Sequence, residues 1–456
     1  MKAQATTTAE TKYSPEQLTE RSVYRRAVEA VLWGMPAVNF DLMLQAFVKI
    51  EGGPNQIVYW SRPLSWHDQT LTPNPDTIYF NPFYNTKDGP IVLEIPPADD
   101  GSITGSVDDS WQNALEDVGP AGVDKGTGGK YLILPPGYNE SVPNGYIPLQ
   151  SDTYQGFAIL RSNLKDGSDA DIARAVTYGK RIKMYPLSAA ASSPETTFID
   201  AYGVMFDATI PYDLRFFESL DRFVQVEPWL TRDKALIKTL KSIGIEKGKP
   251  FSPDAQTRTL LEVAVREARA VIDVHYEQVF EPPFHPGTHW ALPASTEVVE
   301  GMPSFFADPN SYPIDERAVT YAMAYFSAKH LGAGQFYLMS IKDKDGNRFD
   351  GGNTYRLNVP ANAPVKLYWS ATAYDGVTHA LIRDTPRSSR GSNSPGLQKN
   401  RDGSVDVVFG PNASSSNESN WVPTKPGAPF EVLFRFYGPE KALFTKMWIL
   451  PDIERI

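Results

Sequence analysis

Short runs of alternating apolar and polar residues, separated by proline, glycine and asparagine, constrain this chain more than any other feature. A run with period two buries one face of a strand, and regular short strands between turn signals are typical of a β-sandwich or barrel-like domain. An aromatic content of 12%, with 38 prolines and 33 glycines, is also typical of loop-rich β structure. In the first half of the chain the predicted strands are Gln56–Trp60, Thr77–Phe83, Ile91–Ile95, Tyr131–Leu134 and Gly156–Arg161.

A second set of strands follows Gly332. Val365–Tyr374 and Phe430–Tyr437 each carry apolar side chains at every second position, which is the period of a strand with one buried face. Val405–Phe409 and Lys446–Leu450 are predicted as further strands. The C-terminal part therefore reads as a second antiparallel β domain.

Helical patterns occupy the N-terminus and the middle of the chain. Ser14, Pro15 and Gln17 form a capping-box pattern that predicts a helix start. We expect this helix to break at Gly34-Met35-Pro36, because an interior proline removes a hydrogen bond, and to resume from Asp41 to Lys49. The other predicted helices are Ala170–Arg181, Ala255–Tyr276 behind a Ser252-Pro253 cap, and Ile314–His330, which ends before Gly332.

The sequence thus predicts an α+β multidomain fold. It comprises two antiparallel β-sandwich or barrel-like domains, a helical segment between them and an N-terminal helix. The predicted divisions are residues 14–200, 201–333 and 334–456.

Composition restricts the classes of partner and chemistry. The net charge is −10 without a basic stripe, so we expect no nucleic-acid binding. The absence of cysteine excludes disulfides, thiolate nucleophiles and cysteine-ligated zinc. No run of about 20 apolar residues predicts a membrane span, and the first ten residues contain no apolar segment typical of a signal peptide.

The stretch Leu71–Phe83 contains the densest group of candidate site residues. Its two prolines hold the residues before them extended, so Asn74 and Asp76 lie in a stiff turn that leads into a strand. Such a turn can fix a carboxylate, an amide and a phenol relative to each other. The alternative is an Asx-type turn in which Asn74 and Asp76 only satisfy local backbone N–H groups. The polar face of the strand comprises Thr77, Tyr79 and Asn81.

Metal and phosphate motifs are incomplete. His285 and His289 have the spacing of two zinc ligands on a helix, but a proline and a glycine between them oppose helical geometry. Asp343–Asn347 imitates the opening of a calcium loop, but Thr354 replaces the acidic twelfth ligand, and a hairpin turn accounts for it better. Gly126–Lys130 imitates a phosphate loop but leads into a strand. We therefore predict no metal site.

A loop rich in arginine and serine and three tryptophans are further candidates for binding. Guanidinium groups beside hydroxyls suit a carboxylate, sulfate or phosphate, and the alternative is a solvated, flexible loop. The arginines are Arg383, Arg387 and Arg390. Aromatic side chains stack on sugar rings or, as the alternative, fill a core. The tryptophans are Trp111, Trp369 and Trp421.

Several motifs, in this order along the chain, resemble a known bacterial family. They are Asn74-Pro75-Asp76-Thr77-Ile78-Tyr79, Tyr368-Trp369-Ser370, Asn400-Arg401-Asp402-Gly403-Ser404, Asn420-Trp421-Val422-Pro423 and Arg435-Phe436-Tyr437-Gly438-Pro439. Together they resemble the proteins that join the twelve-fifty-four and twelve-fourteen domains of unknown function, over nearly all of the chain. The resemblance implies two β-rich domains around a helical segment and export from the cell in many members, but no agreed reaction. The family-typical motif positions are Asn74, Asp76, Thr77, Tyr79, Trp369, Trp421 and Arg435.

We expect an exported or envelope-associated bacterial enzyme, periplasmic or secreted with a cytoplasmic location as the alternative. It would hydrolyse a small polar or anionic organic substrate in a cleft between the domains, and no cofactor fingerprint appears. Asp76 is the expected general acid or base. The expected catalytic group is Asp76, Tyr79, Asn74 and Lys130; the expected binding group is Thr77, Trp111, Arg161, Tyr185, Tyr368, Trp369, Arg387, Trp421 and Arg435. The alternatives are a non-catalytic glycan- or small-ligand-binding envelope protein, in which the tryptophans stack on sugars, and assembly as a homo-oligomer.

Overall fold

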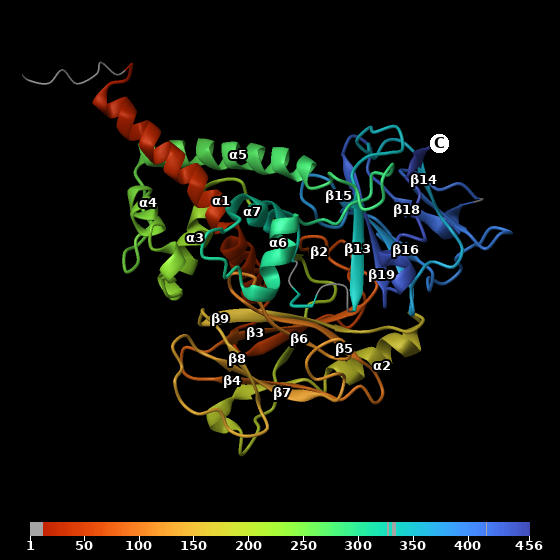
Figure 1. The fold of residues 1–456 in the computed structure, drawn as a ribbon, viewed down its shortest axis with the longest axis horizontal. Coiled ribbons are helices and arrows are strands. Elements are labelled where there is room, and N and C mark those ends of the chain that lie inside the picture. Colours follow the sequence, from red (N-terminus) through yellow and green to blue (C-terminus); the bar gives the residue numbers. More distant parts are fainter. Residues whose placement is uncertain (1–11, 326–327, 331–333, 416) are drawn as a thin grey trace, which may run out of the picture.

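The computed structural model describes residues 12–456 except 326–327, 331–333 and 416. The chain has the predicted α+β multidomain fold, and its described strands close no barrel. The long N-terminal helix and most of the further helices form one group, with the N-terminal pair of sheets below it and the C-terminal pair to its right (Figure 1). The helices are α1 (Pro15–Lys49), α2 (Asp169–Gly179), α3 (Leu214–Val226), α4 (Leu236–Ser242), α5 (Ala255–Gln278), α6 (Thr296–Gly301), α7 (Ile314–Met323) and α8 (Lys441–Phe444).

Helix α1 runs without interruption through the centre of the helical layer. The Ser14 hydroxyl accepts a hydrogen bond from the Gln17 N–H at 3.2 Å, and the Gln17 side chain accepts one from the Ser14 N–H at 2.9 Å, which confirms the capping box. The predicted break at Pro36 was wrong. Because the helix around Pro36 is completely buried, packing outweighs the hydrogen bond that proline removes. Gly34 allows α3 to come close, since a Cβ there would lie 2.9 Å from Leu220 Cδ1.

By length and composition α1 is apolar enough to cross a membrane. However, 78% of its most apolar window is buried inside this fold. The helix therefore serves here as the central core helix, and its apolar surface is used by the neighbouring helices.

The N-terminal β domain is a sandwich of a six-stranded and a four-stranded sheet, in the orders β11-β1-β3-β9-β5-β6 and β10-β4-β7-β8. Most strand pairs are antiparallel, whereas β1–β11 and β7–β8 are parallel. In β3, Ile78 and Phe80 face the core of the sandwich, while Tyr79 and Phe83 face the helices. The strands are β1 (Gln56–Tyr59), β2 (Asp68–Gln69), β3 (Ile78–Asn85), β4 (Ile91–Ile95), β5 (Ile103–Asp109), β6 (Ala114–Val118), β7 (Gly129–Leu134), β8 (Ile147–Gln150), β9 (Gln155–Ser162), β10 (Lys183–Pro186), β11 (Phe198–Asp200) and β12 (Phe206–Asp207).

The cap of α5 and the end of α7 differ from prediction, and α2 and α5 end within two residues of their predicted ends. The cap of α5 is Asp254 rather than Ser252, since the Asp254 carboxylate accepts the Thr257 N–H at 2.8 Å. Helix α7 ends at Met323 rather than at His330, and Gly332 lies outside the described residues. The Asp117 carboxylate accepts the main-chain N–H groups of Lys329 and His330, which are thus bound to the N-terminal domain instead of continuing the helix.

The C-terminal β domain is a sandwich of two four-stranded sheets, in the orders β13-β19-β15-β16 and β18-β17-β14-β20. The strand predicted from Val365 begins only at Trp369, and Leu367 is 63% exposed. Lys446–Leu450 forms no strand; it follows the short α8 and turns at Lys446, whose φ is 56°. The strands are β13 (Gln335–Ser340), β14 (Tyr355–Val359), β15 (Trp369–Asp375), β16 (Ser389–Gly391), β17 (Val405–Gly410), β18 (Trp421–Pro423), β19 (Phe430–Tyr437) and β20 (Glu454–Arg455).

Strand β19 is buried on both faces. Its apolar alternate residues, such as Phe434, fill the C-terminal sandwich. Its polar alternate residues Glu431 and Arg435 are only 1% and 2% exposed, because the other face lies against the helices and the N-terminal domain. A charged side chain is thus buried where the three parts of the fold meet.

Candidate functional site

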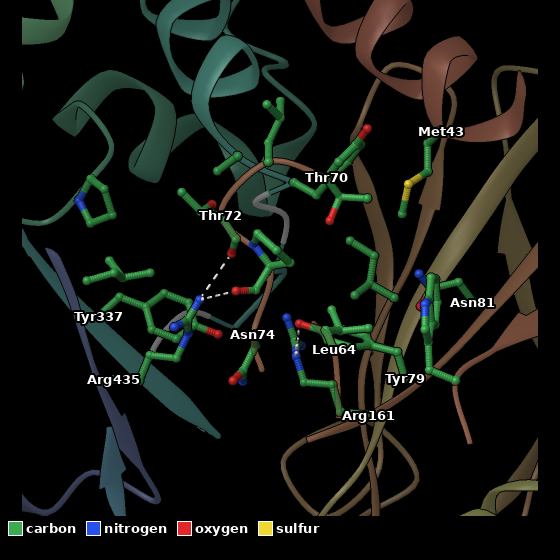
Figure 2. A pocket seen from close by; sticks show the side chains of 18 residues that line it. Met43, Leu64, Thr70, Thr72, Asn74, Tyr79, Asn81, Arg161, Tyr337 and Arg435 are labelled. Atoms are coloured by element: carbon green, nitrogen blue, oxygen red, sulfur yellow. Dashed lines mark hydrogen bonds between the residues drawn. The ribbon is translucent and has the colours of Figure 1, made fainter. Parts of the chain in front are cut away.

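A cavity lies where the N-terminal sandwich, the helical layer and the C-terminal sandwich meet (Figure 2). It has about 690 Å³ of empty space up to its mouth, of which about 60 Å³ can hold the centres of water-sized molecules. The smaller volume is the one that compares with other cavities, and at about 10–15 Å³ for each water it has room for a few water molecules or one small organic ligand. Its walls come from α1, the segment between β1 and β3, strands β3, β9, β13 and β19, Pro293 and the residues just after α7.

The predicted turn at Asn74 lies on this cavity. The Asn74 Oδ1 accepts the Asp76 N–H at 3.0 Å, which is the Asx-type turn. The other end of the same amide, Nδ2, is buried, has no hydrogen-bond partner among the described residues, and belongs to a side chain that lines the cavity. Asn74 therefore stabilises its own loop and presents a donor to the cavity.

Tyr79 and Arg161 form a pair on the cavity wall. They are direct cross-strand neighbours, because β3 and β9 pair in antiparallel register at these positions. The Arg161 guanidinium lies 5.3 Å from the centre of the Tyr79 ring, and its Nε donates to the Tyr79 hydroxyl at 3.4 Å. Within the described part of the chain its terminal nitrogens have no hydrogen-bond partner.

Arg435 enters the cavity from the opposite domain. Its Nη2 donates to the Thr72 carbonyl at 3.0 Å, the Pro73 carbonyl at 3.3 Å and the Tyr374 hydroxyl at 2.6 Å. Its Nη1 donates to the Thr372 hydroxyl at 2.9 Å. All these acceptors are neutral, so they orient the guanidinium without cancelling its charge.

Asp76 lies beside the cavity without lining it. The Ser389 hydroxyl donates to its Oδ1 at 2.6 Å, while Oδ2 is buried without a hydrogen-bond partner among the described residues. Burial raises the pKa of this carboxyl group, against the opposing effects of the Ser389 and Ser370 hydroxyls and the Arg435 charge. Among the described residues no backbone N–H group donates to the Asp76 carboxylate. The Tyr368 hydroxyl donates to the main-chain carbonyl of Asp76 at 2.9 Å.

The electrostatic character of the cavity follows from these contacts. Arg161 and Arg435 both line it, and no carboxylate of the described residues forms an ion pair with either. Burial raises the pKa of Asp76, the nearby acid, while the Arg435 charge acts in the opposite direction. Guanidinium groups bind carboxylates and phosphates well. The cavity is therefore suited to an anion.

Two predicted residues lie together at a different place. Lys130 forms an ion pair with Glu94 at 3.3 Å, and Tyr185 donates a hydrogen bond to the same carboxylate. All three belong to the sheet β10-β4-β7-β8, which lies on the far side of the N-terminal sandwich from the cavity. Thr77, the residue before β3, is buried, and its hydroxyl donates to the Ser162 carbonyl at 3.3 Å.

The predicted tryptophans and Arg387 are dispersed. Trp111 packs against Trp33 of α1 with ring centres 4.9 Å apart, and Trp369 stacks on Phe434 at 5.3 Å inside the C-terminal sandwich. Arg387 is bound to the Glu418 carbonyl and lies 6.0 Å from the Trp421 ring. None of these side chains lines the cavity.

Of the residues that line the cavity, sequence reasoning named Asn74, Tyr79, Arg161 and Arg435 as site residues and missed the others, among them two polar ones beside these. Asn81 lies two positions after Tyr79 on the same face of β3, and it is 2% exposed. Tyr337 of β13 lines the cavity beside Arg435, whose guanidinium lies 5.7 Å from its ring centre. The period-two pattern that places Tyr79 inward also places Asn81 inward, so this signal was available.

The part of the chain that the structure describes contains no cluster of side chains that could bind a metal ion. No group of three histidine or acidic side chains has a metal-binding arrangement there. His289 is instead hydrogen bonded to Asp452 at 2.8 Å. The calcium-like loop is a tight turn in which Asp343 accepts the N–H groups of Asp345 and Asn347.

Two family models match the chain, and both describe proteins of unknown function. Residues 54–186 match DUF1254, and residues 334–441 match DUF1214. No match was found among the curated proteins.

Solved structures of two bacterial proteins were matched to the chain. The VPA0106 protein from Vibrio parahaemolyticus is 17% identical with a TM-score of 0.59, over 95% of this chain and 100% of that one. A putative uncharacterized protein from Burkholderia cenocepacia is 9% identical with a TM-score of 0.43, over 96% and 95%. The first likeness shows the fold alone. With both domain models matched in order, the chain belongs to the family of proteins that join a DUF1254 domain to a DUF1214 domain.

Proposed function

We propose that this protein binds a small organic anion in the cavity between its domains. The observation that carries the proposal is that Arg161 and Arg435 line one partly enclosed cavity without a carboxylate partner among the described residues. Burial of the Arg435 guanidinium carries a desolvation cost, and a bound anion would offset part of that cost.

The contacts of Arg435 and Arg161 indicate different roles for the two side chains in ligand binding. The Arg435 Nη2 already makes three hydrogen bonds to the protein, so it contributes mainly charge. The Arg161 terminal nitrogens and Asn74 Nδ2 have no protein partner among the described residues, so they supply donors to the ligand. Loss of Arg161 should therefore weaken binding without disturbing the domain contacts that Arg435 makes.

The test is calorimetric titration of the purified protein with acetate, succinate and a phosphate monoester, each beside its neutral amide or alcohol analogue. A charge-assisted hydrogen bond is worth about 1.5–3 kcal/mol, so Arg161→Met should weaken binding of the preferred anion about 10- to 100-fold. Arg383→Met is the matched control, because Arg383 is an exposed arginine paired with Asp207 away from the cavity. Equal binding of the anions and their neutral analogues would contradict the proposal.

A second candidate function is hydrolysis of the bound anion with Asp76 as acid or base. It is favoured by the buried, unpartnered Asp76 Oδ2 and by the raised pKa of this carboxyl group. Under this function Asp76→Asn abolishes turnover and leaves ligand affinity within a few fold. In a non-catalytic binder no turnover of any bound anion is detected in the unsubstituted protein.

A further inference from the structure

The wall between the two ends of the cavity is apolar. It is made of side chains from α1, the segment before β3, and strands β9 and β19, and these include Met43, Leu64, Leu71, Ile159 and Leu433. An ion such as free phosphate has no apolar part to place against such a wall. A ligand that fills the cavity gains about 0.8 kcal/mol for each methylene group that it buries.

The charged end of the cavity offers few free donors. Figure 2 shows Arg435, Asn74 and Arg161 near one another, with the Arg435 donors directed at the Thr72 and Pro73 carbonyls. The groups left for a ligand include the Asn74 Nδ2, the Arg161 terminal nitrogens and the Tyr79 hydroxyl, which accepts from Arg161 Nε and keeps its own proton to donate. The planar fork of the Arg161 guanidinium matches the two oxygens of one carboxylate.

A second polar position lies away from this charged end. Figure 2 shows Asn81 on the side of the cavity where Met43 lies, opposite Arg435. Asn81 is 2% exposed, and its Oδ1 is buried without a hydrogen-bond partner among the described residues. A buried amide oxygen without a partner costs about 1–3 kcal/mol, which a donor on the ligand would recover.

We infer that the ligand is an amphipathic organic acid with a carboxylate at one end, an apolar middle, and a hydrogen-bond donor such as a hydroxyl at the other. This inference rests on the proposed function and names its ligand class. The carboxylate binds Arg161 and Asn74, the middle contacts the apolar wall, and the distal hydroxyl donates to Asn81 Oδ1.

The experiment compares four probes by calorimetric titration: acetate, hexanoate, hexanoate with a hydroxyl on its terminal carbon, and hexanol. Hexanoate should bind at least about 10-fold more tightly than acetate because of its four additional methylene groups. The terminal hydroxyl should add about 2- to 12-fold, the range of one net hydrogen bond. Hexanol, which lacks the carboxylate, should bind more weakly than hexanoate.

Asn81→Leu tests the distal contact, since leucine has a similar volume and no acceptor. The preference for the hydroxylated acid over hexanoate should disappear, while hexanoate binds as well as before or better. Asn81→Ser serves as a second variant if leucine impairs folding, and it should change the same ratio. Asn85→Leu is the matched control, because Asn85 lies on the same strand outside the cavity and should leave the ratio unchanged.

The outcomes separate this inference from the function on which it rests. If acetate, hexanoate and the hydroxylated acid bind equally, the ligand class is overturned while anion binding stands. If the hydroxyl gives no gain in the unsubstituted protein, the role of Asn81 is overturned. If no carboxylate binds but the phosphate monoester does, the ligand class is overturned while anion binding stands. If hexanol binds as tightly as hexanoate, or neither the carboxylates nor the phosphate monoester bind, anion binding itself is refuted.

Discussion

Replacement of Arg435 by methionine tests whether this buried guanidinium holds the domains together. The side chain makes four hydrogen bonds, to the Thr72 and Pro73 carbonyls and to the Tyr374 and Thr372 hydroxyls. The Pro73 carbonyl keeps a partner after the change, because the Tyr374 hydroxyl also donates to it at 2.6 Å. The Thr72 carbonyl loses the only partner that the structure shows for it. One or two charge-assisted bonds are thus lost without replacement, and methionine also avoids burying a charge.

At about 1.5–3 kcal/mol for each such bond, and allowing for the relieved desolvation of the guanidinium, Arg435→Met should lower the free energy of unfolding by about 2–4 kcal/mol. Scanning calorimetry and urea unfolding measure the loss, and calorimetry also shows whether the two β domains begin to unfold in separate transitions. Arg387→Met is the control, since this arginine makes one exposed hydrogen bond and should change stability by less than about 0.5 kcal/mol. A loss in Arg435→Met no larger than that in the control would refute the reasoning.

Two further predictions concern buried positions of the N-terminal domain. Burial raises the pKa of Asp68 from 3.8 to about 7, so the contribution of this carboxyl group to stability is fully present below about pH 4 and is lost as the pH rises to about 7. Asp68→Asn should therefore flatten the dependence of the unfolding free energy on pH between pH 4 and 7 by up to about 4 kcal/mol. A pH profile parallel to that of the unsubstituted protein would contradict this. A Cβ at Gly179 would lie 2.0 Å from Cε2 of Phe80, whose ring stacks against Tyr59. Gly179→Ala should therefore lower the free energy of unfolding, measured in urea, by at least about 2 kcal/mol. Gly53→Ala is the control, because a Cβ there meets open space, and it should cost less than about 1 kcal/mol.

The strands were predictable because period-two alternation is a local property of the sequence. Ile91–Ile95 was predicted with the boundaries that β4 has in the structure, and Ser14 and Gln17 form the capping box that their spacing indicated. The errors arose where long-range contacts outweigh local preference. Pro36 is tolerated inside α1 because the surrounding helices bury that part of the helix on all sides.

The candidate site was predictable in part, for the same reason. The turn at Asn74 and the inward side chain of Tyr79 agree with the local pattern. Thr72, expected to be extended before Pro73, instead has a φ of 39°, so that part of the prediction was wrong. The pairing of Tyr79 with Arg161, 82 positions later, depends on the register of β3 with β9, which no local pattern specifies. Lys130 and Tyr185 are likewise close to each other but on a different sheet, and only the topology decides that this sheet faces away from the cavity.

In strand β19 the charged residues at alternate positions lie on a buried face of the sheet. On a strand with one solvated face, Glu431 and Arg435 would be ordinary surface residues, yet both are almost fully buried and contact other parts of the fold. Because the cavity walls come from both β domains and the helices, a ligand bound there contacts all three parts at once. Such a ligand binds only the assembled protein, so at 100 times its dissociation constant it adds about 2.7 kcal/mol to the stability of the whole. Binding should therefore raise the unfolding temperatures of the two β domains together, and a shift confined to one domain would show that the ligand is bound elsewhere.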